Sequence, residues 1–210
     1  MVPMTLTLYG GARTRASMPR WYLEEKEISY EWQMLDMRDG EHRRNPYLSI
    51  NPFGKLPALV HEDPTCPGGR LQLFESGAIL LYLAELSGEC RTQASRNLAA
   101  QWVLFANATL ATALFVPSNR EKEFPRLMAV LNELLKPGQP LMGHEWGVAD
   151  CAVNAYLAYL PMFFPDLDLT PYPSVQATIS ATTKRHAYLK AINTEAPSEH
   201  IYTHKNNKTR

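Results

Sequence analysis

The chain has 210 residues, 45% of them hydrophobic, and is longer than the usual domain of ~100–150 residues, so one large domain or two small ones can form. Lys plus Arg and Asp plus Glu number 21 each, which gives no charge bias toward nucleic acid or an anionic membrane. No stretch approaches the ~18 apolar residues of a membrane span, and we expect a cytoplasmic protein. The three cysteines are far apart and without nearby histidine patterns, so neither a disulfide framework nor a metal site is expected.

The first part of the chain alternates between strand and helix patterns. We expect strands over residues 5–9, 30–35, 56–61 and 70–74, and helices over residues 18–26 and 76–86. The order β-α-β followed by β-β-α predicts a mixed four-stranded sheet flanked by helices.

Strand patterns almost vanish after Gly88, and the second part reads as helical. We expect helices over residues 97–116, 121–135 and 148–164, and a last helical stretch from Tyr172 toward Ile192. Gly147 and Asp150 have the spacing of a capping box, but Gly147 has no hydroxyl, so only half of the box remains. The change of pattern predicts an α/β domain over residues 1–86, an all-α domain over 93–193 and a polar tail over 194–210.

Two short motifs in the α/β part carry chemistry. Leu56-Pro57 directly precedes a strand, and a cis bond there would turn the Leu56 backbone toward an extended peptide, whereas the structural alternative is a plain trans-proline turn. Glu75-Ser76 lies where a strand ends and a helix begins, so Ser76 and the helix amides can meet a carboxylate while Glu75 meets an ammonium. The alternative for this pair is a simple helix cap.

The paired motif, NPFGKLPAL over residues 51–59 and ESGAI over 75–79, closely resembles the cytosolic glutathione S-transferases. The resemblance covers residues 5 to about 193 and implies a thioredoxin-like N-terminal domain followed by an all-α C-terminal domain. It implies that Pro57 is cis, that the Leu56 backbone holds the cysteinyl part of glutathione, and that Glu75 and Ser76 bind its γ-glutamyl end.

Cations between the second and third strands are candidates for the glycine end of glutathione. His42 and Arg43 match positions that reach the glycine carboxylate in phi-like glutathione transferases, and Lys55 is a further candidate. The alternative for Arg43 and Arg44 is a solvated charged face.

The residues offer several candidates for the group that activates the thiol. The nucleophile is the thiolate, so a family member must lower a thiol pKa of ~8.5 with a donor between the first strand and the first helix. One alignment with the family places Thr14 at the usual serine, and another places Arg15 at the usual cysteine. Thr14, Arg13, Arg15 and Tyr9 therefore remain candidates, as in the less common chi-like classes. The proline at position 19 predicts that the first helix starts between residues 14 and 17.

The second substrate is expected between the first loop and the long helix of the all-α domain. Candidates for its lining are Phe105, Thr109, Thr112 and Phe115, although core packing explains apolar helix positions equally well. The resemblance implies conjugation of the glutathione thiolate to a small electrophile, a detoxification-type reaction, with glutathione as co-substrate and no other cofactor.

Other functions of the same fold stay open. A glutathione-dependent isomerase, dehalogenase or peroxidase would keep the same peptide site, and a non-catalytic protein-assembly module would not need it. The family also implies a homodimer, to which Leu80, Leu83 and Trp102 would contribute, unless these side chains belong to the core.

Overall fold

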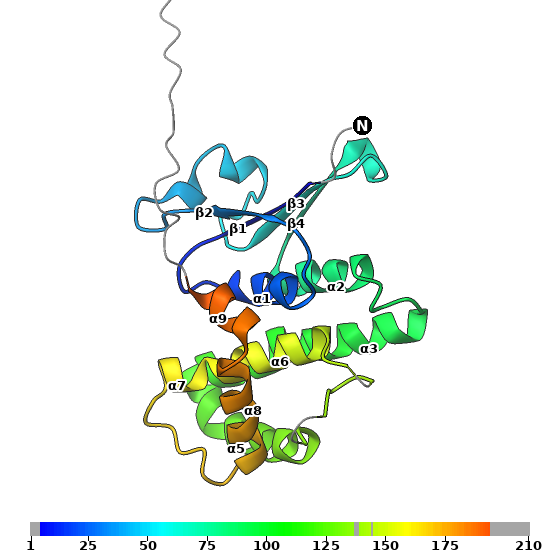
Figure 1. Ribbon diagram of the computed structural model, residues 1–210. Helices are drawn as coiled ribbons and strands as arrows, with labels where there is room; N and C mark the ends of the chain where they lie inside the picture. Colours follow the sequence, from blue (N-terminus) through cyan, green and yellow to red (C-terminus); the bar gives the residue numbers. More distant parts are fainter. Residues whose placement is uncertain (1–4, 137–138, 144, 194–210) are drawn as a thin grey trace, which may run out of the picture.

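The computed structural model describes residues 5–136, 139–143 and 145–193 (Figure 1). A four-stranded mixed sheet forms the α/β part, in the order β2-β1-β3-β4. Strand β1 pairs in parallel with β2 and antiparallel with β3, which pairs antiparallel with β4. The strands are β1 (Thr5–Gly10), β2 (Glu31–Met34), β3 (Ala58–Glu62) and β4 (Arg70–Phe74).

Two helices, α1 (Ser17–Glu25) and α2 (Ser76–Leu86), cover one face of this sheet (Figure 1). Alternation along β1 directs Leu6 and Leu8 into the core that these helices complete. Thr7 and Tyr9 point to the other face. The segment between β2 and β3 lies on that face and includes two short 3₁₀ helices, η1 (Glu41–Arg43) and η2 (Tyr47–Ser49).

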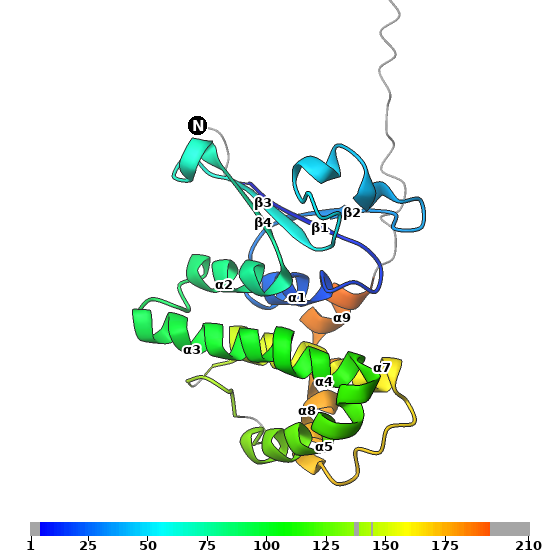
Figure 2. The ribbon, with the colours of Figure 1, turned by 180° about the vertical axis from the view of Figure 1, so that it is seen from behind.

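The helical part lies below α1 and α2 in the views of Figures 1 and 2. Its first helix, α3 (Gln93–Leu104), continues through a π-helical segment, η4 (Phe105–Leu110), into α4 (Ala111–Phe115). The remaining helices are α5 (Pro117–Leu134), α6 (Val148–Ala158), α7 (Leu160–Phe163), α8 (Pro173–Thr183) and α9 (His186–Ile192).

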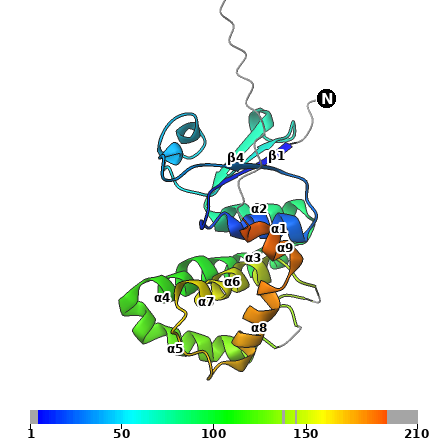
Figure 3. The same cartoon turned by 60° about the vertical axis from the view of Figure 1, so that its left-hand side comes forward.

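The last helix brings the chain back to the α/β part, where α9 packs beside α1 (Figure 3). Lys190 forms an ion pair with Glu24 at 2.5 Å, and Arg185 forms one with Glu25. These contacts hold the start of α9 at the end of α1. Nearer the start of α1, where the candidate site lies, Arg20 donates to the Ala191 carbonyl at 3.3 Å.

The start of α6 joins the two parts through a carboxylate from outside the helix. Asp150 accepts the Gly147 amide at 3.0 Å, as the half capping box predicted, and Glu89 accepts the Val148 amide at 2.7 Å. Glu89 also accepts the Tyr22 hydroxyl of α1 at 2.6 Å. A Cβ at Gly147 would lie 2.2 Å from the Glu89 carboxylate, so the missing side chain makes room for the replacement cap.

Most of the predicted elements are confirmed, and the differences occur at helix ends. The long helix begins at Gln93 because Thr92 and Ser95 form a reciprocal cap. The helix predicted over 148–164 is interrupted at Tyr159, and the last helical stretch is interrupted between α8 and α9. Leu80 and Leu83 are fully buried inside the chain, which corrects the expectation that they contribute to a dimer interface. The predicted polar tail, residues 194–210, lies outside the described residues.

The segment Gln93–Phe115 corrects one expectation from composition. By length and hydropathy it is apolar enough to cross a membrane, although we expected no such stretch. In this structure 39% of its most apolar window is buried, and it packs against α2, α5 and α6. A core helix of a soluble protein has the same length and hydropathy, so the finding is weak support for a membrane span.

Candidate functional site

The turn before β3 presents the Leu56 backbone at one end of the sheet. The Leu56–Pro57 bond is cis, which confirms the expectation for this proline, and Asn45–Pro46 is a second cis bond that the sequence analysis did not identify. The carbonyl of Lys55 accepts from the Tyr47 hydroxyl and, at 2.8 Å, from the side-chain amide of Asn51. This turn is therefore held from the side of the protein, and the side chain of Lys55 is exposed.

The start of α2 combines an unusual backbone with uncapped amides. Glu75 has φ +70° and ψ 119°, a sparsely populated region for a residue with a side chain, and its carboxylate is exposed. Ser76 is buried with 2% exposure. Within the described part of the chain, no side chain accepts from the first amides of α2. Such an arrangement suits a carboxylate ligand.

Ser76 also connects the two parts of the chain. Its hydroxyl donates to Asn107 Oδ1 at 3.0 Å, and the Tyr156 hydroxyl of α6 donates to the same oxygen at 3.0 Å. Asn107 lies in the π-helical segment, and its side-chain amide donates to the Val103 carbonyl at 3.1 Å. Asn107 was not identified from the sequence, although it is the one amide side chain in the apolar segment 102–116, which is a signal for such a role.

Thr14 organises the loop between β1 and α1. Its hydroxyl donates to the Gly11 carbonyl at 2.8 Å and accepts from the amides of Gly11 and Ala16, both at 3.3 Å. The first helix begins at Ser17, as the proline at position 19 predicted. Thr14 therefore supports the turn in this structure, with its proton directed to a carbonyl.

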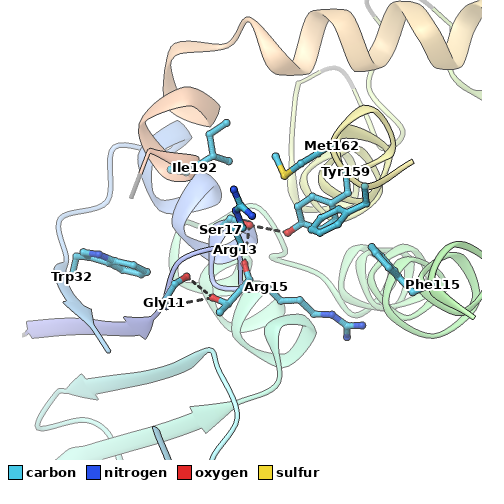
Figure 4. Close-up of a pocket in the computed structure, with 12 residues that line it drawn as sticks. Gly11, Arg13, Arg15, Ser17, Trp32, Phe115, Tyr159, Met162 and Ile192 are labelled. Carbon is cyan, nitrogen blue, oxygen red and sulfur yellow. Dashed lines mark hydrogen bonds between the residues drawn. The ribbon is translucent and has the colours of Figure 1, made fainter. Parts of the chain in front are cut away.

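A cavity of about 240 Å³ opens beside this loop (Figure 4). One wall carries polar groups of the β1–α1 loop, including Arg13, Thr14, Arg15 and Ser17. The opposite wall is largely apolar and comes from α4, α6–α7 and α9: Phe115, Tyr159, Met162, Phe163, Ala191 and Ile192. The two walls therefore place hydroxyls and cations opposite aromatic rings.

A hydrogen bond between hydroxyls joins the two walls. Ser17 Oγ and Tyr159 OH are 2.8 Å apart, and Ser17 also donates to the Thr14 carbonyl at 3.2 Å (Figure 4). Burial raises the pKa of Tyr159, so its hydroxyl keeps its proton at neutral pH. Ser17 and Tyr159 were not identified from the sequence because their proximity depends on how the helical part packs on α1.

The two arginines of the loop lie at the same cavity with exposed side chains. The Arg15 guanidinium lies 5.6 Å from the centre of the Tyr156 ring, and Figure 4 shows it extending toward the side of Phe115. Burial raises the pKa of Tyr156 to about 12, with a smaller opposing effect from the charge of Arg15. Arg13 has φ 56°, in the left-handed region. Both cations can therefore face an anion in the cavity.

Tyr9 does not line this cavity. It packs with Tyr47 at a ring separation of 5.8 Å, on the face of the sheet away from α1. Burial raises the pKa of Tyr9 as well.

Only one of the four residues considered for the second substrate lies at the cavity. Phe115 lines the cavity. Phe105 contacts Trp102 and lines a separate hollow between α3 and α5. Thr109 and Thr112 are exposed and are not among the residues that line the cavity.

The residues considered for the glycine end lie in neighbouring loops. A Cβ at Gly54 would lie 2.9 Å from the His42 carbonyl, so the loop that contains His42 and Arg43 packs closely on the turn before Leu56. His42 is buried, and its Nδ1 has no hydrogen-bond partner among the described residues. Arg43 is exposed, and Arg44 forms an ion pair with Asp39.

Comparison with known proteins agrees with this geometry. Residues 4–85 match the family model for the glutathione S-transferase N-terminal domain. The chain is 34% identical to the disulfide-bond oxidoreductase YfcG of Escherichia coli, over 74% of this chain and 79% of that protein. It is 30% identical to the glutathione S-transferase GstB of the same organism, over 81% of this chain and 88% of that protein.

Solved structures with glutathione bound are also similar. A glutathione transferase of Burkholderia graminis, with two glutathione molecules per subunit, aligns with a TM-score of 0.75 and 28% identity over 92% of this chain and 90% of its own. A glutathione transferase of Pseudomonas putida, with one glutathione disulfide per subunit, aligns with a TM-score of 0.71 and 27% identity over 94% of both chains.

Proposed function

Because the chain belongs to the glutathione S-transferase family, we propose that it activates the glutathione thiol and transfers it to a small electrophile. The observation that carries this proposal is the cavity in which hydroxyls and arginines of the β1–α1 loop face the aromatic wall of the helical part. Such a cavity suits an apolar electrophile held against a thiolate.

In the proposed complex, glutathione lies along the edge formed by Leu56, Glu75 and Ser76. The Leu56 amide and carbonyl pair with the cysteinyl part as an added strand. The uncapped amides of α2 and the Ser76 hydroxyl meet the γ-glutamyl carboxylate, and Glu75 meets its ammonium. The glycine carboxylate binds near His42, Arg43 and Lys55. The exposed cations Arg43 and Lys55 attract it by their charge.

Thiol activation is proposed to come from Thr14, Arg13 and Arg15 together. The Thr14 hydroxyl would turn from the neutral Gly11 carbonyl to the thiolate, because hydrogen bonds to ionised acceptors are about twice as strong. The arginines at the cavity would add a positive potential that favours the thiolate. The position of Tyr9 on the far face of the sheet makes it the weakest of the four candidates.

Reduction of disulfides is a second candidate, because a similar glutathione transferase structure holds a glutathione disulfide. None of the three cysteines lines the cavity, so an exchange would use the sulfur of glutathione itself. Its thiolate would attack one sulfur of a disulfide, forming a mixed disulfide and releasing the other sulfur as a thiolate. A second glutathione thiolate would then attack the glutathione sulfur of the mixed disulfide, releasing the remaining thiolate and forming glutathione disulfide. YfcG, a relative named as an oxidoreductase, gives this candidate further support.

Glutathione-coupled assays distinguish these functions. The substrates are an aryl halide, an isothiocyanate, a hydroperoxide, a halo-acid, an isomerisable substrate and a small disulfide. Conjugation is expected to be the fastest reaction with the apolar electrophiles. If the disulfide is turned over faster than the apolar electrophiles, disulfide reduction is the main function and conjugation is not. Lack of retention on immobilised glutathione, together with no turnover, would favour the assembly module.

We also propose a cytoplasmic homodimer with a detoxification-type role. Phe53 is 71% exposed and forms an edge-to-face pair with Phe74, and Leu104 on α3 is 63% exposed. Apolar side chains this exposed are candidates for a protein interface. Light scattering should give about twice 23.8 kDa at micromolar concentration.

A further inference from the structure

Three metal-binding side chains gather at the tip of the β3–β4 hairpin. The ligand atoms of His61, Asp63 and Cys66 all lie within 4.8 Å of one another. The loop is the turquoise turn beside the N label in Figure 1, at the far end of the sheet from α7 and the cavity. The proposed thiol-transfer function therefore makes no use of these residues.

His61 is held by a hydrogen-bond partner on α2. It pairs with Leu6 across the sheet, so its ring faces the helices, and it is 2% exposed. Its Nδ1 lies 2.5 Å from the Tyr82 hydroxyl of α2. When Nδ1 donates this hydrogen bond, the lone pair of Nε2 points to the loop, the arrangement in which a metal-bound histidine is held by a second partner.

Asp63 has one oxygen fixed and one directed at His61. Its Oδ1 accepts from the amide and the hydroxyl of Thr65, both at 2.8 Å. Its Oδ2 lies 3.9 Å from His61 Nε2, which is too long for a hydrogen bond. The space between these atoms is therefore bounded by two groups that both bind cations.

Cys66 is brought to the same place by the turn. Its amide donates to the Asp63 carbonyl at 2.9 Å, and its carbonyl accepts from the Gly69 amide at 2.8 Å. The thiol is partly exposed, forms no disulfide and lies within hydrogen-bonding reach of the Tyr82 hydroxyl, the same hydroxyl that meets His61. A partly exposed thiol beside an imidazole and a carboxylate gives a nitrogen, oxygen and sulfur donor set.

We propose that His61, Asp63 and Cys66 bind a zinc ion, with the fourth position open to solvent. Thiolate and imidazole ligands suit Zn²⁺, which prefers tetrahedral geometry. Two metal bonds of ~2.0–2.1 Å at a tetrahedral angle separate their ligand atoms by about 3.3 Å. His61 Nε2 and Asp63 Oδ2, which are 3.9 Å apart, would need to approach by about 0.6 Å. The ion would join β3 to the loop and, through Tyr82, to α2.

This site was not indicated by the sequence because its spacing, H-x-D-x-x-C over residues 61–66, does not match the usual paired zinc motifs. It depends on the antiparallel pairing that folds the loop back over His61. The carboxylate in the set also makes it a weaker pattern than one of cysteines alone.

Cobalt(II) titration of the full chain tests the proposal, because a thiolate bound to cobalt gives an intense ultraviolet charge-transfer band. We expect this band to saturate at one cobalt per chain, to disappear on adding zinc, and to be absent in Cys66→Ser. The matched control is Cys90→Ser, whose thiol is buried outside the loop, and which should keep the band. A band that survives in Cys66→Ser, or no band in the unaltered chain, would overturn the proposal.

Tyr82→Phe provides a second test that leaves all three ligands in place. Loss of the partner behind a metal-bound histidine should weaken cobalt binding by roughly 10–100-fold. Zinc should also raise the melting temperature of the unaltered chain and Cys90→Ser, but not of Cys66→Ser. Equal cobalt affinity of Tyr82→Phe and the unaltered chain would contradict the role given to Tyr82, and an unchanged melting temperature with zinc would contradict the site.

Discussion

The helices α2 and α6 begin in opposite ways, although both starts lie where the α/β part meets the helical part. At α6 the chain supplies its own carboxylates, because Asp150 accepts the Gly147 amide and Glu89 accepts the Val148 amide. At α2 no described side chain accepts from the first amides, and Glu75 holds a positive φ. Every helix start leaves amides without a partner inside the helix. The two starts therefore differ in which groups accept hydrogen bonds from these amides.

This difference separates a structural helix start from a binding one. The α6 start is complete within the chain and connects three segments that are far apart in sequence. The α2 start lacks an internal anion, and its dipole favours a negative group from outside. The α1 start is intermediate, since the Thr14 hydroxyl accepts the Ala16 amide while the loop faces the cavity. Substitutions at the three starts should therefore have different effects.

The largest effect is expected at α6, on stability. Glu89→Ala removes the acceptor of both the Tyr22 hydroxyl and the Val148 amide. The Val148 amide is left without an acceptor, which costs about 1–3 kcal/mol, whereas the Tyr22 hydroxyl keeps Ser87 Oγ at 2.8 Å as a partner and loses about 1 kcal/mol. The free energy of unfolding should therefore fall by about 2–4 kcal/mol. Urea unfolding measures this loss, and Glu89→Gln, which keeps one acceptor oxygen, should lose less.

The same variant, Glu89→Ala, should lose stability without losing affinity for glutathione. At a temperature where Glu89→Ala is folded, its dissociation constant for glutathione should equal that of the unaltered chain. A clear loss of affinity with little loss of stability would show that the α6 start also serves binding, and the comparison with α2 would fail.

The next effect is expected at α2, on binding. Ser76→Ala should weaken glutathione binding by about 1.5–3 kcal/mol, the value of one hydrogen bond to a charged group. Calorimetric titration measures the change, and Ser180→Ala, at an exposed serine of α8, is the matched control. An unchanged dissociation constant would mean that Ser76 serves only its contact with Asn107.

The parts of this site that were predictable from the sequence are those in which neighbouring residues act together. The cis bond before Pro57 and the Ser76 helix start follow from motifs of a few residues. The links from Ser76 to Asn107 and from Ser17 to Tyr159 could not be predicted, since each spans tens of residues and depends on how the helices pack. Glu89 was not predicted for the same reason. The absence of a hydroxyl at Gly147 nevertheless indicated that another group must accept a hydrogen bond at the start of α6.

A smaller effect is expected at α1, on rate. If Thr14 donates to the thiolate, Thr14→Ala should slow conjugation by one to two orders of magnitude, about 1.4–2.8 kcal/mol, and Thr14→Ser should largely keep the rate. The apparent pKa of bound glutathione should rise in the alanine variant, because a stabiliser of the thiolate is lost. The pH profile of conjugation measures both quantities.

Arginine variants decide between a hydroxyl and a positive potential. A greater loss of rate in Arg13→Ala or Arg15→Ala than in Thr14→Ala would assign activation mainly to charge. Normal profiles in all three variants would leave Tyr9 or the loop amides, and the assignment to Thr14 would be wrong.

The smallest effect is expected from Tyr159→Phe, which keeps the aromatic wall and removes only the hydroxyl that Ser17 meets at 2.8 Å. Ser17 retains the Thr14 carbonyl as a partner at 3.2 Å, so the loss should be that of one neutral hydrogen bond, about 0.5–1.5 kcal/mol of stability. The raised pKa of Tyr159 keeps its hydroxyl protonated across the neutral range, so the pH profile of conjugation should keep its midpoint.

Tyr172→Phe, which removes a hydroxyl remote from the cavity, is the control. A rate more than tenfold lower in Tyr159→Phe alone would show that this hydroxyl donates to the reacting groups, and the start of α1 would then be completed by the helical part rather than by Thr14.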